Sequence, residues 1–401
     1  MYKIIDYITK KEVTAEGLIF VGDNPWEVVM DLSKIKQNLD KKAFLASPPS
    51  YDKYLPFLPV ENRQALITLD ELATPLIPSK RLGPERGLDL DFKVEGYCPS
   101  GSYKDRGSAL EVSIAKANNA HGIILASTGN MAASCACYAA VAQLRCIVIV
   151  PNKTPLTKLA QAIAYGGHIV QVDGTYNDAE RLAVESAKAH GFYLAGDYAF
   201  RVEGQKTAAF ELCDQLAGTA PDIVFIPIGC GTNLAAYAKG FKEYKELGLC
   251  DKVPKLIGVE ATGANAVVRG FEHHAHEPVP VDNVDTIASA IAIHDPIDGR
   301  KALDAIYETG GEALEVTDQE ILQARHMLAC NEGLFIESSG AATFAALQKY
   351  MASHDVSGKK IVCVLTGHGL KDSKVIFEHV DEPPIIEPTL EAFNKLYNST
   401  W

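Results

Sequence analysis

The sequence predicts an α/β protein in which mostly parallel, open sheets carry helices on both faces. From about residue 91 onward, short apolar runs alternate with Ala-rich or amphipathic stretches of helix length. Parallel neighbours need a crossover connection, usually a helix, so this alternation indicates parallel strands covered by crossover helices. The runs that we interpret as strands are residues 92–95, 122–126, 146–150, 168–172, 222–227, 255–260 and 360–365.

The spacing of these runs predicts two sheet domains within residues 76–375, one built mainly from about 110–205 and the other from the remainder. Residues 1–75 differ in character, with short strand-like pieces such as 18–21, and predict a small N-terminal lobe. Residues 376–401 are expected to form a C-terminal tail. The most apolar stretch, 131–151, is interrupted by polar residues and predicts a buried helix followed by a buried strand, not a membrane span.

Composition narrows the classes of function. Apolar residues make up 47% of the 401 residues and charged residues 22%, which is typical of a globular protein. The 38 basic and 51 acidic residues give a net charge of -13 without a basic run, which disfavours binding to nucleic acid or to anionic membranes. Nine cysteines without a Cys-x-x-Cys pair, and an N-terminus without a signal pattern, predict free thiols and a cytoplasmic protein.

Four polar, glycine-rich segments follow predicted strands, where ligands bind in open parallel sheets. In the first, residues 99–107, a helix is expected to begin near Ser102, which places Lys104 in its first turn. The helix dipole there lowers the pKa of an amine, and Schiff-base chemistry needs the neutral amine. The alternative is a solvated lysine in a charged turn.

The second and third segments could bind anions. Residues 127–134 combine a strand end, a glycine turn and a helix N-terminus, whose free N–H groups suit a carboxylate or phosphate. Simple helix capping explains the same residue types. In residues 229–233, glycines at a strand end allow backbone amides to wrap a phosphate, although a tight turn is the alternative. No dinucleotide or nucleoside-triphosphate motif is present.

The fourth segment begins with Thr366 after the run 360–365. A hydroxyl at this position can meet the ring nitrogen of a cofactor, whereas the nearby His368 is more often structural in such a turn. Together, a lysine, a carboxylate cradle, a phosphate cradle and this hydroxyl match the needs of pyridoxal phosphate and an amino acid.

The chain resembles the threonine synthase branch of the fold-type II pyridoxal-phosphate enzymes, the tryptophan synthase β-like group, from about residue 70 to 375. The motifs that carry the resemblance are residues 74–76, 100–107, 126–130, 203–207, 227–233 and 365–372. The resemblance implies pyridoxal 5'-phosphate as cofactor and an amino-acid substrate. The implied reaction converts O-phospho-L-homoserine and water to L-threonine and phosphate.

The resemblance also implies roles for individual residues. Lys104 is expected to form the Schiff base with the cofactor and then to take the Cα proton. The other implied cofactor-binding residues are Asn130, Gly229, Cys230, Gly231, Thr232, Asn233 and Thr366. The implied substrate-binding residues are Ser127, Thr128, Gly129 and, for the substrate phosphate, Arg201.

Two departures from the family pattern keep other functions open. Cys230 stands where the family commonly has an asparagine that contacts the substrate phosphate. Ala195 and Gly196 stand where many members have an Asn-Ser pair. One alternative is therefore a pyridoxal-phosphate lyase or β-replacement enzyme on another amino acid, similar to a serine/threonine deaminase. The other is a non-catalytic paralog that binds the cofactor.

Two further expectations concern metals and assembly. His273, His274 and His276 could bind Zn²⁺, but the usual fourth ligand is not evident, so a solvated loop is favoured and no metal is expected. By analogy with the fold-type II group, the chain is expected to form a homodimer.

Overall fold

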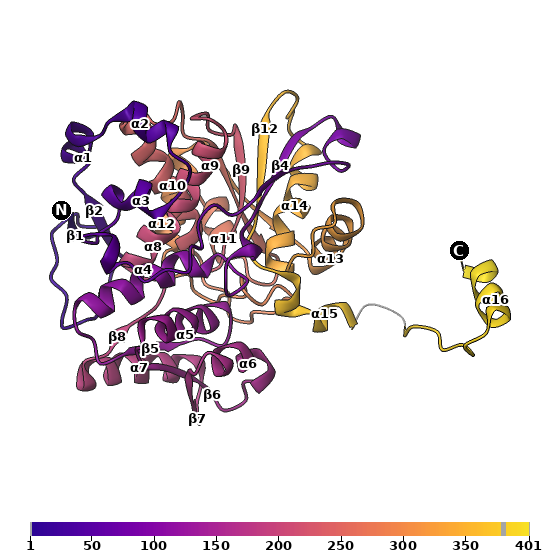
Figure 1. The fold of residues 1–401 in the computed structure, drawn as a ribbon, viewed down its shortest axis with the longest axis horizontal. Coiled ribbons are helices and arrows are strands. Elements are labelled where there is room, and N and C mark those ends of the chain that lie inside the picture. The colour runs from indigo at the N-terminus through magenta and orange to yellow at the C-terminus, as the bar shows by residue number, and fades with distance from the viewer. Residues whose placement is uncertain (1, 378–381, 401) are drawn as a thin grey trace. The chain divides into compact units, whose positions relative to one another are not determined.

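A computed structural model describes residues 2–377 and 382–400. The chain divides into two compact units, residues 1–371 and 372–401. The second unit contains the helices α15 (Lys374–Phe377) and α16 (Leu390–Thr400). The first unit contains two mainly parallel sheets and an antiparallel strand pair near the N-terminus (Figure 1).

The larger sheet has six strands in the order β11-β10-β9-β12-β4-β3. All neighbours are parallel except β3, which pairs antiparallel with β4 at one edge. The strands are β3 (Leu76–Pro78), β4 (Asp89–Val94), β9 (Ile223–Pro227), β10 (Lys255–Ala261), β11 (Glu312–Val316) and β12 (Lys360–Leu365).

The smaller sheet has four parallel strands in the order β7-β6-β5-β8. They are β5 (Ile123–Ala126), β6 (Cys146–Pro151), β7 (His168–Val172) and β8 (Tyr193–Leu194). Each of the seven apolar runs of the sequence coincides with a strand, so the predicted α/β fold class is confirmed. The edge strands β3, β8 and β11 were not predicted because they are short or only partly apolar.

Alternate residues of one central strand enter different cores, because side chains of a strand point to opposite faces. Val224 and Ile226 of β9 pack with α9, α10 and α12, while Ile223 and Phe225 pack with α13 and α14. Figure 1 shows these helices on the two sides of the sheet. The helices around this sheet are α9 (Thr207–Gln215), α10 (Thr232–Glu246), α11 (Ala266–Glu272), α12 (Gly299–Glu308), α13 (Asp318–Met327) and α14 (Ser338–Met351).

The smaller sheet is covered in the same way. Ile123 and Leu125 of β5 share a core with α4 and α5, and Ile124 shares another with the alanines of α7. The helices of this part are α4 (Lys104–Ala117), α5 (Asn130–Ala142), α6 (Leu156–Ala164), α7 (Tyr176–His190) and α8 (Ala199–Gln205). The apolar stretch 131–151 is α5 followed by β6, as predicted.

The N-terminal residues form β1 (Tyr2–Asp6), which pairs antiparallel with β2 (Trp26–Met30), and then α1 (Leu32–Asn38), α2 (Lys41–Ala46) and α3 (Tyr51–Tyr54). The expected strand-like piece 18–21 was wrong. Only an isolated bridge joins Glu16 to Ile19, and the apolar side chains of Ile19 and Phe20 are instead buried in the core clusters. The division at residues 75 and 375 stays a prediction.

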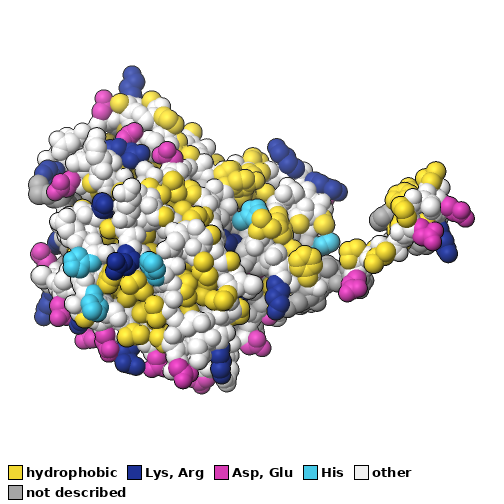
Figure 2. All heavy atoms as spheres, turned by 60° about the horizontal axis from the view of Figure 1, so that its bottom comes forward, with side chains coloured by type: hydrophobic (Ala, Val, Ile, Leu, Met, Phe, Trp, Pro, Cys, Tyr) yellow, Lys and Arg dark blue, Asp and Glu magenta, His cyan; other side chains and the backbone are white. Residues whose placement is uncertain are grey.

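The surface carries charges of both signs. On the face in Figure 2, Lys and Arg side chains lie scattered among Asp and Glu side chains and form no continuous basic patch. Among the described residues, no helix has the length and apolar character needed to span a membrane.

Candidate active site

Lys104 is the first residue of α4, as the predicted helix start near Ser102 requires. Its Nζ lies 2.8 Å from Oδ1 and 3.2 Å from Oδ2 of Asp197. Asp197 lies in the turn between β8 and α8, 93 residues further along the chain. The two side chains are only 12% and 7% exposed. The structure therefore places an amine and a carboxylate in one secluded ion pair.

The expected lowering of the Lys104 pKa was wrong. Burial favours the neutral amine, but the Asp197 carboxylate, with smaller contributions from Tyr103 and Cys230, outweighs this effect and raises the pKa of Lys104 above its ordinary value. No feature of the sequence indicated that a carboxylate from the turn between β8 and α8 would lie beside the start of α4.

Residues 229–233 comprise the end of the β9–α10 connection and the first two residues of α10, and they form a cradle of backbone amides. Among the described residues, none of these amides has a backbone acceptor, and Nδ2 of the buried Asn233 has no hydrogen-bond partner. Gly231 has φ +88°, and a Cβ built there would lie 2.5 Å from the carbonyl oxygen of Asp298. Unsatisfied donors at a helix N-terminus, with glycine where the backbones approach, suit a phosphate.

Glu337, which precedes α14, joins two of the predicted site residues. Its Oε2 accepts a hydrogen bond from Nδ2 of Asn130 at 2.9 Å, and its Oε1 accepts one from the Thr366 hydroxyl at 3.3 Å. The carbonyl of Thr366 accepts from the Tyr103 amide at 3.0 Å. The N-termini of α4, α5 and α14 therefore meet at the end of β12. Glu337 is not among the site residues predicted from the sequence, so this link was missed.

The segment from Ser127 to Gly129 lies between β5 and α5. The Gly129 amide donates to the Ser127 hydroxyl at 3.4 Å, and no heavy atom lies within 4 Å of a Cβ built on Gly129. Within the part of the chain that the structure describes, the backbone amides of residues 130–132 have no acceptor. The expected carboxylate cradle thus has free donors and open space in front of it; Thr128 lies within it and is half-buried.

Arg201 lies next to Lys104 but points into the core. Its guanidinium is fully buried, forms an ion pair with Glu111, and donates to the carbonyls of Gly196 at 2.8 Å and Lys104 at 3.2 Å. Its expected contact with a substrate phosphate stays a prediction, and it would require the pair with Glu111 to open.

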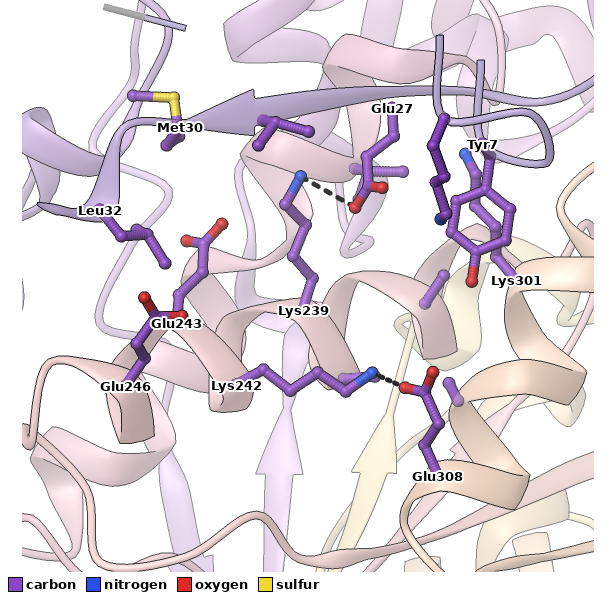
Figure 3. A pocket seen from close by; sticks show the side chains of 16 residues that line it. Tyr7, Glu27, Met30, Leu32, Lys239, Lys242, Glu243, Glu246, Lys301 and Glu308 are labelled. Carbon is purple, nitrogen blue, oxygen red and sulfur yellow. Dashed lines mark hydrogen bonds and ion pairs between the residues drawn. The ribbon is translucent and has the colours of Figure 1, made fainter. Parts of the chain in front are cut away.

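A separate cavity of about 320 Å³ lies between the β1–β2 pair, α10 and α12 (Figure 3). None of the predicted site residues lines it. Lys239, at its centre, lies 2.6 Å from a Glu203 oxygen and 3.4 Å from one of Glu27. These charges connect the N-terminal strands to α8 and α10, so we assign them a structural role.

The histidine cluster provides no candidate metal centre. Nδ1 of His276 lies 2.5 Å from the Asp304 carboxylate, which also accepts from the Tyr7 hydroxyl. No group of three or more His, Cys, Asp or Glu side chains in residues 2–377 and 382–400 is arranged to hold a metal ion. All nine cysteines are free thiols.

A secluded lysine amine beside an amide cradle for phosphate is an arrangement suited to a phosphorylated aldehyde. The sequence also matches the family described as "Pyridoxal-phosphate dependent enzyme" over residues 67–367. The chain belongs to this family.

Similarity to individual members extends over almost the whole chain. It is 40% identical to a threonine synthase of Methanocaldococcus jannaschii over 374 residues, 92% of each protein. It is 42% identical to one of Halalkalibacterium halodurans over 84% of this chain and 94% of that protein. The processed form of threonine deaminase isoform 2 from Solanum lycopersicum has the same fold, with a TM-score of 0.67 at 23% identity over 92% of this chain and 98% of that one.

The predicted pyridoxal-phosphate cofactor is thus confirmed for this family member, together with the fold-type II architecture. The free amides of residues 229–233 and the unpartnered Asn233 nitrogen fit the phosphate group of this cofactor, and the Lys104 amine fits its aldehyde. Both features belong to this chain and do not depend on the comparison.

Proposed function

We propose that this pyridoxal-phosphate dependent enzyme is a threonine synthase, which converts O-phospho-L-homoserine and water to L-threonine and phosphate. The observation that carries the proposal is the 40% identity to a threonine synthase over 92% of both chains. The amine, the two amide cradles and the Thr366 hydroxyl support it, because they supply one partner for each polar part of the cofactor and for the substrate carboxylate.

Lys104 is proposed to hold the cofactor covalently through Nζ and, once the substrate amine has displaced it, to move protons at the substrate carbons. Residues 229–233 bind the cofactor phosphate through backbone amides, assisted by the side chain of Asn233. When bound, pyridoxal phosphate supplies an electron-withdrawing system that stabilises negative charge on the substrate.

Asn130 and Thr366 orient the ring of the cofactor, the former at its phenolic oxygen and the latter at its pyridine nitrogen. Glu337 accepts hydrogen bonds from both side chains and orients them. Because the Thr366 hydroxyl has a single proton, it would turn from Glu337 to donate to the pyridine nitrogen when the cofactor is bound. The segment from Ser127 to Gly129, with the free amides of α5, holds the substrate carboxylate. A hydroxyl rather than a carboxylate at the pyridine nitrogen leaves that nitrogen largely neutral, which suits elimination and replacement chemistry.

The test is to supply O-phospho-L-homoserine to the holoenzyme and to measure inorganic phosphate and L-threonine together. We expect equal amounts of both products, and neither with Lys104→Ala. Phosphate without threonine would contradict the proposal and indicate elimination to a keto acid.

A second candidate is a lyase on serine or threonine. It is favoured by the charges near Lys104, since Arg201 is paired with Glu111 and Asp197 adds a carboxylate, which leaves little positive charge for a substrate phosphate. Ammonia release from L-threonine or L-serine, with no phosphate release from O-phospho-L-homoserine, would select it. A non-catalytic paralog would yield no product from any of the three amino acids.

We also propose a cytoplasmic location and a homodimer. The free thiols suit a reducing cytoplasm, and the fold-type II analogy suits a homodimer. Light scattering of the purified holoenzyme would give twice the chain mass of 43.3 kDa for a dimer.

A further inference from the structure

The carboxylate of Asp197 is held rigidly next to Lys104. The residue before it, Gly196, donates its amide to Glu111 at 3.2 Å and accepts from Nε of Arg201 at 2.8 Å. The ion pair between Glu111 and Arg201 therefore clamps the turn that carries Asp197. Since the clamp is fully buried, Asp197 has little freedom to turn away from the amine.

Asp197 is the ion-pair partner of Lys104. Arg201 also acts on the Asp197 carboxylate, but it forms its own ion pair with Glu111, and several further titratable groups lie near Asp197. These groups are the thiol of Cys230, which bonds the carboxylate, the phenols of Tyr103, Tyr176 and Tyr198, and the carboxyl of Asp298. The Asp197 pKa is lowered despite burial, because Lys104 and Arg201 stabilise its charged form.

We propose that Asp197 is a positioning residue that holds Nζ of Lys104 and stabilises its ammonium form, which makes the free amine a stronger base toward the substrate. The proton balance is simple. The proton leaves the substrate Cα, the electron pair of the C–H bond stays on carbon, and a new N–H bond forms on the neutral amine. The ammonium then faces the Asp197 carboxylate, which stays ionised throughout. This proposal rests on the proposed function only for the identity of the substrate whose Cα loses the proton.

The spectrum of the holoenzyme tests this without reference to the substrate. The absorbance of the Lys104-bound cofactor near 410–420 nm depends on a proton at the lysine nitrogen. A carboxylate this close shifts the pKa of its partner by about one to three pH units. Asp197→Asn should therefore move the midpoint of the absorbance titration down by about that amount, while Asp197→Glu restores part of it.

Asp214→Asn is the matched control, because the side chain of Asp214 is also buried and paired with a lysine, Lys53, at 2.8 Å. Its partners Lys53 and Tyr54 are not predicted site residues. It should leave the midpoint unchanged. A midpoint within about 0.3 pH units of the wild type in folded Asp197→Asn would overturn the proposal. If that variant does not fold, Asp197→Ser, which is smaller and also neutral, takes its place with the same expectation.

Kinetics separate this role from a general structural one. With O-phospho-L-homoserine, Asp197→Asn should lower kcat by up to about ten-fold for each pKa unit by which the base is weakened, and should change KM little, because the rate of proton transfer follows the strength of the base. A raised KM with unchanged kcat would contradict the proposal. If the wild type does not use this substrate, the proposed function fails while the spectral titration still decides the role of Asp197.

Discussion

Gly231→Ala should damage the proposed phosphate cradle without a direct change at Lys104. Gly231 has φ +88°, a left-handed conformation that costs an alanine about 1–2 kcal/mol. In addition, its new Cβ would lie 2.5 Å from the carbonyl oxygen and 2.6 Å from the carbonyl carbon of Asp298. Both atoms belong to the backbone, so the loop of residues 229–233 has to move away from this contact.

The movement should weaken cofactor binding more than it weakens the fold. A hydrogen bond to a charged group contributes about 1.5–3 kcal/mol, so misplacing one cradle amide should lower the affinity for pyridoxal phosphate by about ten-fold to more than one hundred-fold. Titration of the cofactor-free protein with pyridoxal phosphate, followed by absorbance, measures this affinity. Denaturant unfolding of the same protein measures the free energy of unfolding.

Gly166→Ala is the matched control. Gly166 has a similar φ of +84°, but no heavy atom lies within 4 Å of a Cβ built there. The Gly166→Ala variant should lose about 1–2 kcal/mol of stability, which is the conformational cost of the alanine, and should keep the wild-type affinity for the cofactor. Equal losses of stability and equal affinities in the two variants would refute the reasoning, because the collision with Asp298 would then have no consequence.

Three other predictions concern stability. Arg106→Met leaves the buried carboxylates of Glu95 and Glu211 without the guanidinium that each contacts within 2.7 Å. The free energy of unfolding, measured by denaturant titration, should therefore fall by about 3–5 kcal/mol, and a loss below about 1 kcal/mol would contradict the prediction. Burial raises the pKa of Glu260 from 4.5 to about 8, so the folded state binds this proton more tightly than the unfolded state and loses stability as pH rises through this range. Glu260→Gln should therefore reduce the fall in the free energy of unfolding with pH by up to about 1.4 kcal/mol per pH unit, and an unchanged pH dependence would count against the prediction. Free pyridoxal phosphate at one hundred times its Kd should stabilise the wild type by about 2.7 kcal/mol, seen as a Tm that rises with cofactor concentration, and a constant Tm would speak against binding to the folded state.

The sheets could be predicted from the sequence because their central strands are buried on both faces. Such strands read as continuous apolar runs, as in 222–227 and 360–365, and each is followed by a polar turn. The short edge strand β8 has only two residues and carries no such signal. The family resemblance drew attention to Ala195 and Gly196 in the turn after β8, but it assigned no role to Asp197, the next residue.

Contacts between segments that are far apart in the sequence limited how much of the candidate site could be predicted. The sequence places Lys104, Asn130 and Thr366 at strand ends or helix starts, but Glu337, which hydrogen-bonds two of them, comes from a fourth segment 207 residues beyond Asn130. A carboxylate at the start of a helix has an ordinary local explanation, stabilisation by the helix dipole. Only the packing of α14 against β12 shows that Glu337 faces the other site residues.

The arrangement of helix N-termini around Lys104 suggests what the proposed role of Asp197 would contribute. The helices α4, α5, α10 and α14 begin at residues 104, 130, 232 and 338, so several positive dipole ends meet around the site. They favour the phosphate and carboxylate of the ligands, but they disfavour an ammonium on Lys104. A base that takes a proton from carbon in this field requires a fixed negative charge beside it. Under our proposal the carboxylate of Asp197, 2.8 Å from Nζ, provides that charge, so the two proposed anion cradles and a basic lysine can share one site.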